Sequence, residues 1–575
     1  MLHKWLYSKT GWLLLLGAAL AGIVATHWLP GRVDVTAEQR YTITQPTRRL
    51  LAGLQQPVQV YVLLKGSQMP AGFIKLANTT QGFLANCRSY SNGRLSYSFI
   101  EPTEFLQDSI RFPLPDSAKA DWLKQNAIKQ NELTQTGSRA VFNYPVALIT
   151  NGEQYTTVNL LQGQGSTGFL NPQAGTLQLE TINRAEAQLE YLFAQAIQQL
   201  TTTYTPIIAY TTGHGQPTGP ETFSLSQTIQ DKFRFYLLNL PTQPFISDSI
   251  KVLLIVKPTQ PFNDADKLKI DQYLMRGGRV IFLVDALYAG MDSLMASGKD
   301  FIAYPRNLNL DDLLFKYGVR INPNLVEDRQ CDVLPQAVGM VGNQPQIEVL
   351  PWPYFPLLYS TSNHPISKSL DAVVMQFPNS VDTVKAPGIE KHILLATSNT
   401  SRLTGAPVQV TVEVLKNWEN ASLWRAAQVP VAVLTQGAFS SLFANRLPGA
   451  VADSLAAQGC PYLAKASQPG QVVVTGDADW VLNGMSRQGP LPMGTNPYTQ
   501  YQFANQTFLQ NILDFLTDEQ GIMASRSKEF VLRALNPKLL EKQKTAWQWL
   551  NIGLPLALLL IFGIIFQVVR QRRYA

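Results

Sequence analysis

The chain has 575 residues, of which 45% are hydrophobic and 15% charged, and its formal net charge is +7. This length predicts more than one domain, and the apolar fraction is sufficient to bury ordinary hydrophobic cores. The charge is confined to one end: from Gly521 onward nine basic residues stand against two acidic ones, which accounts for the whole excess. The remaining chain is neutral, which argues against the basic surface typical of a nucleic-acid-binding protein.

Each end of the chain carries an uncharged stretch long enough to cross a bilayer. Residues 10–31 and 545–569 contain no Asp, Glu, Lys or Arg, and a transmembrane helix needs roughly 20 apolar residues. We expect residues 1–31 to be an N-terminal transmembrane anchor, with a cleaved signal peptide as the alternative, and residues 547–575 to be a C-terminal transmembrane helix with a basic tail. The residues expected to contact lipid or a membrane partner are Trp12, Trp28, Trp547, Trp549, Asn551, Pro555, Arg570, Arg572 and Arg573.

Residues 32–202 show the element order of a thioredoxin-like domain. The patterns predict a strand at 56–64, a helix at 70–89, a strand at 94–100, a helix at 117–129, a hairpin at 146–161 and a helix at 181–200. The Asn151-Gly152 pair marks the hairpin turn. Cys87, Cys331 and Cys460 are far apart and none belongs to a Cys-x-x-Cys pair, so neither thioredoxin-type redox chemistry nor a zinc site is expected.

Residues 203–520 predict a Rossmann-like α/β domain. Continuous apolar runs are typical of strands in a parallel sheet that is covered on both faces, and they occur at 206–210, 252–256, 279–284, 392–397, 429–434 and 471–475. Helices are predicted at 221–235, 264–275 and 503–516, and this alternation implies right-handed crossovers. The Pro-rich stretch around 286–391 predicts an irregular insertion, and residues 521–546 predict a basic juxtamembrane linker helix broken at Asn536-Pro537.

The motifs of several enzyme classes are absent from the sequence. It contains no P-loop, no Gly-x-Ser-x-Gly elbow at a strand end and no His-Glu-x-x-His motif. None of the five histidines has a neighbour at the spacing of metal ligands. We therefore expect no enzymatic activity, no catalytic residue, no metal and no cofactor.

Glycines and aspartates after three predicted strands form the best candidate ligand site. In open α/β sheets, ligands bind beyond the carboxyl ends of the strands. The candidate residues are Gly213, His214, Gly215, Asp285, Gly476, Asp477 and Asp479. The alternative is structural, because the same residue types are common in turns and helix caps. The aromatic cluster of Trp352, Tyr354 and Phe355 also has two interpretations: it is either a surface that binds a partner or a buried edge of the domain.

Short segments spread along the chain match one family. They include Arg40-Tyr41-Thr42-Ile43-Thr44, Leu189-Glu190-Tyr191 with Phe193-Ala194, the Gly213-His214-Gly215 turn, Trp547 with Leu550-Asn551 and Leu554-Pro555, and Arg572-Arg573-Tyr574. In these segments the chain resembles GldG, the auxiliary (substrate-binding) membrane subunit of the ABC transporter linked to gliding motility in Bacteroidetes. One departure is Gln216, where the family pattern has an acidic residue.

The resemblance implies a non-enzymatic subunit that works with a separate ABC permease and, through it, a cytoplasmic ABC ATPase. It implies a bacterial inner-membrane protein with a periplasmic body, and we place both termini in the cytoplasm. The second domain would be glutamine-amidotransferase-like, without that fold's nucleophilic cysteine. Two alternatives remain open: a membrane-anchored ligand-binding or hydrolase-like protein that uses the Gly213-His214-Gly215 crevice, and a structural scaffold for a motility or secretion machine.

Overall fold

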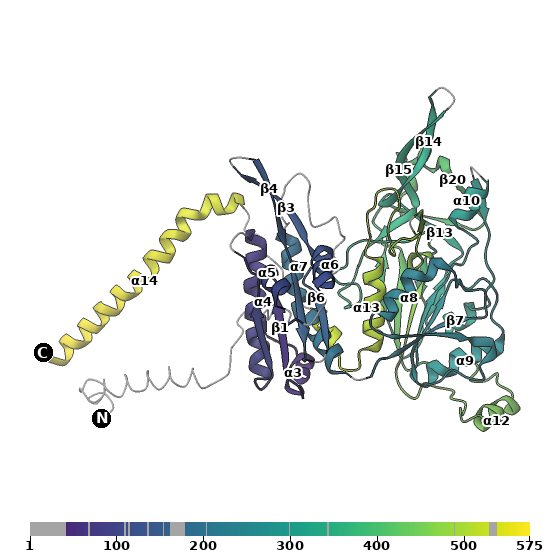
Figure 1. Ribbon diagram of the computed structural model, residues 1–575, viewed down its shortest axis with the longest axis horizontal. Helices are drawn as coiled ribbons and strands as arrows, with labels where there is room; N and C mark the ends of the chain where they lie inside the picture. The colour runs from purple at the N-terminus through teal and green to yellow at the C-terminus, as the bar shows by residue number, and fades with distance from the viewer. Residues whose placement is uncertain are drawn as a thin grey trace. The chain divides into compact units, whose positions relative to one another are not determined.

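A computed structural model describes residues 42–574, except 67–68, 109–110, 113–115, 135–136, 153, 162–178, 203, 298–299, 342–343, 488 and 528–536. The expected N-terminal anchor, with Trp12 and Trp28, lies outside these residues. The chain divides into two compact units, Met1–Lys528 and Glu529–Ala575. The described part of the first is a mixed α/β body with several sheets, and the described part of the second is a single long helix (Figure 1).

The first sheet has four strands in the order β2-β1-β5-β6. These are β1 (Val58–Val62), β2 (Leu95–Phe99), β5 (Val146–Thr150) and β6 (Tyr155–Asn159). β1 runs parallel to β2 and antiparallel to β5, and β5 runs antiparallel to β6. A further hairpin is formed by β3 (Ile128–Thr134) and β4 (Gly137–Asn143). The sequence predicted the four sheet strands but not this hairpin.

Helices cover both faces of the first sheet. One face packs against α3 (Gln45–Ala52), α4 (Ala71–Tyr90) and α7 (Leu179–Thr201), and the other against α5 (Pro102–Gln107) and α6 (Asp116–Asn126). Successive side chains of a strand point to opposite faces. Ala147 and Ile149 of β5 therefore join the α4–α7 core, while Val146 and Leu148 join the α5–α6 core.

The second sheet has seven strands in the order β18-β21-β22-β10-β9-β7-β8. They are β7 (Ile207–Thr212), β8 (Arg234–Asn239), β9 (Ile250–Val256), β10 (Arg279–Leu283), β18 (Ile389–Ala396), β21 (Pro430–Gly437) and β22 (Gly470–Thr475). The five strands from β8 to β22 are mutually parallel, and β21 runs antiparallel to both of its neighbours. The predicted apolar runs at 206–210, 252–256, 279–284, 392–397, 429–434 and 471–475 all form strands of this sheet.

Two layers of helices enclose the second sheet. α8 (Phe223–Gln230) and α13 (Asn505–Thr517) share a core with Leu254 of β9, and α9 (Asp264–Met275) and α11 (Asp311–Lys316) share one with Leu253. One predicted helix is shorter in the structure. The helix predicted over 221–235 ends at Gln230, and Arg234 begins β8. The first apolar residues of β8 also fit the spacing of a helix that continues from α8, and for this reason the prediction extended the helix into the strand.

The stretch 286–391 is more regular than its prolines predicted. It contains α10 (Met291–Ser297), β11 (Asp300–Ala303), β12 (Val319–Ile321), β13 (Asn324–Asp328), β14 (Cys331–Val341), β15 (Gln344–Leu358), β16 (Val373–Val374) and β17 (Val381–Thr383). β14 and β15 pair as a long hairpin, visible at the top of Figure 1, whose register shifts twice at irregularities. Such irregularities are where a strand tolerates proline.

The aromatic residues of β15 settle one alternative. Trp352, Tyr354 and Phe355 are buried in one cluster, where Tyr354 and Phe355 pack against Phe377 and Trp352 packs against Tyr354. They therefore form a buried edge rather than an exposed partner surface. Further elements are β19 (Ser401–Gly405), β20 (Val408–Thr411), α12 (Gly449–Ala457), β23 (Met485–Ser486), β24 (Gly489–Pro490) and several short 3-10 helices, among them η6 (Ile522–Ser527).

The described residues of the second unit form α14 (Pro537–Tyr574). Within it, Gln543–Arg572 is long and apolar enough to cross a membrane, and none of its apolar window is buried. At 1.5 Å per residue this segment extends about 45 Å, more than a hydrocarbon core requires. α14 begins at Pro537, where the linker helix was predicted to break and where proline suits the first turn of a helix. From there it continues without interruption through the rest of the predicted linker into the apolar segment.

Candidate functional site

The three predicted aspartates come together at the carboxyl edge of the second sheet. Asp285 follows β10, while Asp477 and Asp479 follow β22, the adjacent parallel strand. The Ala478 backbone N–H donates a 2.8 Å hydrogen bond to Asp285 Oδ1. Lys257, which follows β9, pairs with both Asp479 and Asp285, and its Nζ is 3.7 Å from Asp285 Oδ2. The site therefore holds one lysine that the sequence did not single out.

Burial sets the protonation of this cluster. It raises the pKa of Asp285 to about 6, helped by the charge of Asp479 and opposed by Lys257. Burial, then the charges of Asp479 and Asp285, also holds the pKa of Asp477 well above its ordinary range. Burial lowers the pKa of Lys257, but Asp479 and Asp285 raise it by more. The cluster is a shielded ion-pair network, and no metal-binding group of three or more ligands occurs among the described residues.

His214 belongs to a second, separate network. Its ring is buried, stacks on Phe262 with 3.8 Å between ring centroids, and places Nε2 3.2 Å from Asp266 Oδ2. Burial lowers its pKa, with Asp266 acting in the opposite direction, so the imidazole is neutral at pH 7 and donates Nε2–H to the carboxylate. Lys269 also contacts Asp266, at 2.8 Å. The side-chain partners of His214 are therefore Asp266 and Phe262, not the aspartates after β10 and β22.

The glycines of the predicted site are required by close packing. Gly213 and Gly215 have positive φ angles of 105° and 73°, a region that favours glycine. A Cβ on Gly476 would lie 2.0 Å from the carbonyl oxygen of Asn379. Each glycine thus has a structural reason to be present. Whether these residues and the two networks also bind a ligand stays a prediction.

The aspartate cluster and the His214 network each include residues that the sequence analysis did not predict and that are distant in sequence from the predicted ones. Lys257 and Phe262 lie in the β9–α9 connection, and Asp266 lies in the first turn of α9. Lys257 has a φ of 45°, uncommon for a residue with a side chain. No motif marks these positions, so only the position of β9 between β7 and β10 could have suggested them.

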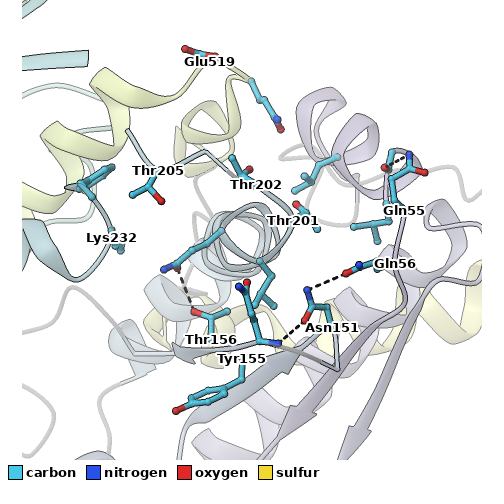
Figure 2. A pocket seen from close by; sticks show the side chains of 18 of the residues that line it. Gln55, Gln56, Asn151, Tyr155, Thr156, Thr201, Thr202, Thr205, Lys232 and Glu519 are labelled. Carbon is cyan, nitrogen blue, oxygen red and sulfur yellow. Dashed lines mark hydrogen bonds between the residues drawn. The ribbon is translucent and has the colours of Figure 1, made fainter. Parts of the chain in front are cut away.

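A large polar pocket lies elsewhere in the body, where the first sheet meets α8. Its volume is about 1330 Å³, and Figure 2 shows its lining seen from close by. The turn after β5 supplies Asn151 and the start of β6 supplies Tyr155, and Asn151 Nδ2 donates a 3.2 Å hydrogen bond to Gln56 Oε1. In the lining, the Thr156 hydroxyl of β6 donates a 3.4 Å hydrogen bond to Gln199 Oε1 of α7. Sequence analysis did not identify this pocket, because its lining comes from five separate segments.

Three helices end at this pocket. The lining includes Gly53 after α3, Thr201 at the end of α7 and Asp231 after α8. Helix C-termini carry unpaired carbonyl groups and a partial negative charge. Lys232, the lysine among the lining residues, forms an ion pair with Asp514, with 3.2 Å between Nζ and Oδ2.

The residues predicted to contact lipid or a partner in the second unit all lie on α14. They are Trp547, Trp549, Asn551, Pro555, Arg570, Arg572 and Arg573. Trp547 and Trp549 are 58% and 73% exposed, near one end of the apolar segment, as expected for tryptophans at a membrane interface. Their contacts with lipid or protein remain a prediction.

Comparison with protein families identifies the class. A family model described as an ABC-type uncharacterized transport system matches residues 205–512, which is more than half of the chain. The chain therefore belongs to this family of auxiliary ABC transport proteins, and its role is auxiliary to an ABC transport system. A second model, described as a domain of unknown function, matches residues 37–150. No curated protein matches the chain.

Three solved structures show distant likenesses to the chain. The N-terminal domain of mmIFT52 is 14% identical with a TM-score of 0.30, covering 54% of this chain and 98% of that domain. A ThuA-like protein from Parabacteroides merdae is 10% identical with a TM-score of 0.26, covering 54% and 90%. The exo-β-1,4-mannosidase Op5Man5 from an Opitutaceae bacterium is 10% identical with a TM-score of 0.19, covering 87% and 57%. At these scores the likenesses carry no argument.

Proposed function

We propose that this chain is a non-enzymatic, membrane-anchored subunit of an ABC transporter, with a separate permease and a separate cytoplasmic ATPase as partners. The observation that carries the proposal is the match of the auxiliary ABC transport family to residues 205–512. The sequence has no P-loop, so the energy of ATP hydrolysis must come from another chain.

α14 supports the anchored arrangement. Its apolar segment is unburied in the structure, and an exposed apolar helix of this length is stable only in lipid or against other membrane helices. Tryptophans mark one end of the span and arginines the other. We propose that this helix packs against the permease while the body acts outside the cytoplasm.

Finer features of the proposal come from the sequence. We assign the chain to the gliding-motility GldG type, with a second span near the N-terminus, both termini in the cytoplasm and the body in the periplasm of a bacterial inner membrane. We also regard the first sheet as thioredoxin-like and the second as Rossmann-like. The strand order β2-β1-β5-β6 and the five parallel strands from β8 to β22 support these two fold assignments.

Co-purification tests the proposal. The tagged full chain is extracted from its native membranes in mild detergent, and the proteins recovered with it are quantified by mass spectrometry. We expect enrichment of a polytopic membrane protein and of a P-loop ATPase. Recovery of neither, or ATP hydrolysis by the purified chain alone, would overturn the proposal.

A variant in which residues 550–569 are replaced by an unrelated apolar helix of equal length serves as the matched control. It keeps the anchor and the body but changes the helix surface. We expect it to reach the membrane at normal abundance and to lose most of the co-purified permease.

A further inference from the structure

The outer strand β8 leaves one edge of the second sheet without a neighbouring strand. β8 is last in the strand order, and among the strands that the structure describes it pairs only with β7. The Arg234 N–H donates a hydrogen bond to the Pro206 carbonyl on the β7 side. Successive residues of a strand direct their backbone groups to opposite sides, so Phe235, Leu237 and Asn239 direct theirs outward. These three residues define the free edge of β8.

The opposite edge of the same sheet is protected against pairing. There, β18 carries the charged residues Glu390 and Lys391, its register with β21 shifts twice, and Ala396 forms a bridge with Tyr359. Charges, irregularities and covering segments are the devices by which proteins prevent edge-to-edge pairing. In the described part of the chain, β8 lacks them: the three residues of its free edge are uncharged, the strand contains no proline, and its register with β7 is regular.

Two large apolar side chains of β8 are exposed, one on each face of the sheet. Leu237 is 55% exposed and lies on the α8 side, as Phe235 does. Tyr236 is 50% exposed and lies on the α9 side, as Leu238 does. A partner that covers one face would leave the other side chain in water. A strand added to the edge covers both, because its own side chains alternate between the faces.

The backbone groups of the free edge are complementary to themselves. In a two-fold dimer the same surface of both copies meets, and a two-fold axis at Leu237 places the two β8 strands antiparallel. Leu237 then exchanges both N–H···O bonds with Leu237 of the partner subunit, and Phe235 does so with Asn239 of the partner subunit. The Asn239 carbonyl also accepts a 2.9 Å hydrogen bond from the Thr242 hydroxyl, and its second lone pair remains for the pairing.

The side chains agree with the same register. Tyr236 lies opposite Leu238 of the partner subunit, and Arg234, the one charged residue of β8, lies opposite Leu240 of the partner subunit, so no like charges face each other. A second copy therefore supplies an apolar strand that fits without any further component. We propose that the free edge of β8 binds the same edge of a second copy of this chain, antiparallel and with the two-fold axis at Leu237. The inference goes beyond the proposed transporter role and does not depend on it.

Disulfide crosslinking of the full chain in its native membranes tests the proposed register. A hydrogen-bonded pair on the axis holds its Cα atoms about 5.5 Å apart, within the roughly 4.4–6.8 Å that a disulfide spans. Under mild oxidation we expect Leu237→Cys to form a reducible band of twice the chain's mass. Arg234→Cys is the control on the same strand, because the two copies of this residue would lie roughly 20 Å apart. The original chain, with its own three cysteines, is the background control.

A charge at the axis tests the strength of the association. Leu237→Lys places two like charges directly opposite each other, so we expect the dissociation constant of the dimer in detergent, measured by sedimentation, to rise at least about tenfold. Leu403→Lys is the matched control, since Leu403 is 43% exposed on β19, and it should leave the constant unchanged. Thermal melting checks that each variant folds.

Three results would overturn the inference. They are no more dimer band from Leu237→Cys than from Arg234→Cys, a dimer that persists unchanged in Leu237→Lys, and a disulfide that joins Leu237→Cys to a different protein. The last result would assign the free edge to another partner. The proposed transporter role would survive each of them, because it is tested by the recovery of a permease and an ATPase.

Discussion

The hydroxyl of Tyr191 donates a 2.9 Å hydrogen bond to Asp514 Oδ2, although 323 residues separate them in the sequence. The bond joins α7, which packs on the first sheet, to α13, which packs on the second. Lys232 contacts the same carboxylate oxygen, and the guanidinium of Arg526 lies 5.4 Å from the centre of the Tyr191 ring. Since Arg526 belongs to η6, this cluster ties the end of the body to both sheets.

Replacing Tyr191 with Phe tests that connection. The ring and its packing remain, and only the hydrogen bond to Asp514 is lost. We expect the free energy of unfolding to fall by about 1.5–3 kcal/mol, the usual range for a hydrogen bond to a charged group, measured by urea unfolding of the full chain in detergent. Tyr236→Phe, at an exposed position, should change it little. Equal stability of the two variants would show that the bond does not hold the two sheets together.

Gly476 is predicted to tolerate no side chain. A Cβ there would meet the backbone of Asn379, which cannot move aside as a side-chain end could. Gly476→Ala should therefore lower stability by about 3 kcal/mol or reduce the folded yield. Gly405→Ala is the matched control, because its Cβ would have no neighbour within 4 Å. Comparable yields and melting temperatures for both variants would contradict this packing.

The Asp285 cluster predicts a specific pH dependence. The folded chain holds the proton of Asp285 up to about pH 6, whereas an unburied Asp titrates near 3.8. The stability that this group contributes is therefore present below about pH 4 and is lost as the pH rises through 6. Asp285→Asn should remove this loss, so the melting temperature of the variant relative to the original chain should rise between pH 5 and pH 7.

Comparing Asp285→Asn with the original chain separates the titration of Asp285 from that of the histidines. His214 and His364 have lowered pKa values, chiefly through burial, so they contribute stability that is lost toward acid pH, the opposite direction. They are the same in both proteins and cancel in the difference. A difference in melting temperature that stays constant over this pH range would show that Asp285 does not titrate there.

His214→Phe distinguishes a structural role of His214 from a ligand-binding one. The stacking on Phe262 is kept and the hydrogen bond to Asp266 is lost, so we expect about 1 kcal/mol of destabilisation and unchanged recovery of partner proteins. The alternative, a ligand site that includes His214, Asp477 and Asp479, requires loss of function at normal protein abundance when these residues are replaced.

The sequence predicted elements whose signals are local. The apolar runs that became β7, β9, β10 and β22 needed only their own residues to be recognised, and so did the amphipathic α7. β8 and the hairpin of β14 and β15 were missed, because the first resembles a helix continuation and the second carries several prolines. The site was predicted less well than the fold. His214 and Asp285 do lie at the carboxyl edge of one sheet, but their separation into two networks depends on Lys257, Asp266 and Phe262, which no motif connects to them.

In-membrane photo-crosslinking tests the central claim that this chain is an anchored subunit beside a permease. A photoreactive amino acid is placed in turn at Leu559, Leu560, Ile561 and Phe562, four exposed positions of α14 that together cover a full turn. The account predicts that at least one position crosslinks in native membranes to a polytopic protein of an ABC system, while the same probe at Tyr498 on the body surface does not. Crosslinks to lipid alone at all four positions would contradict it.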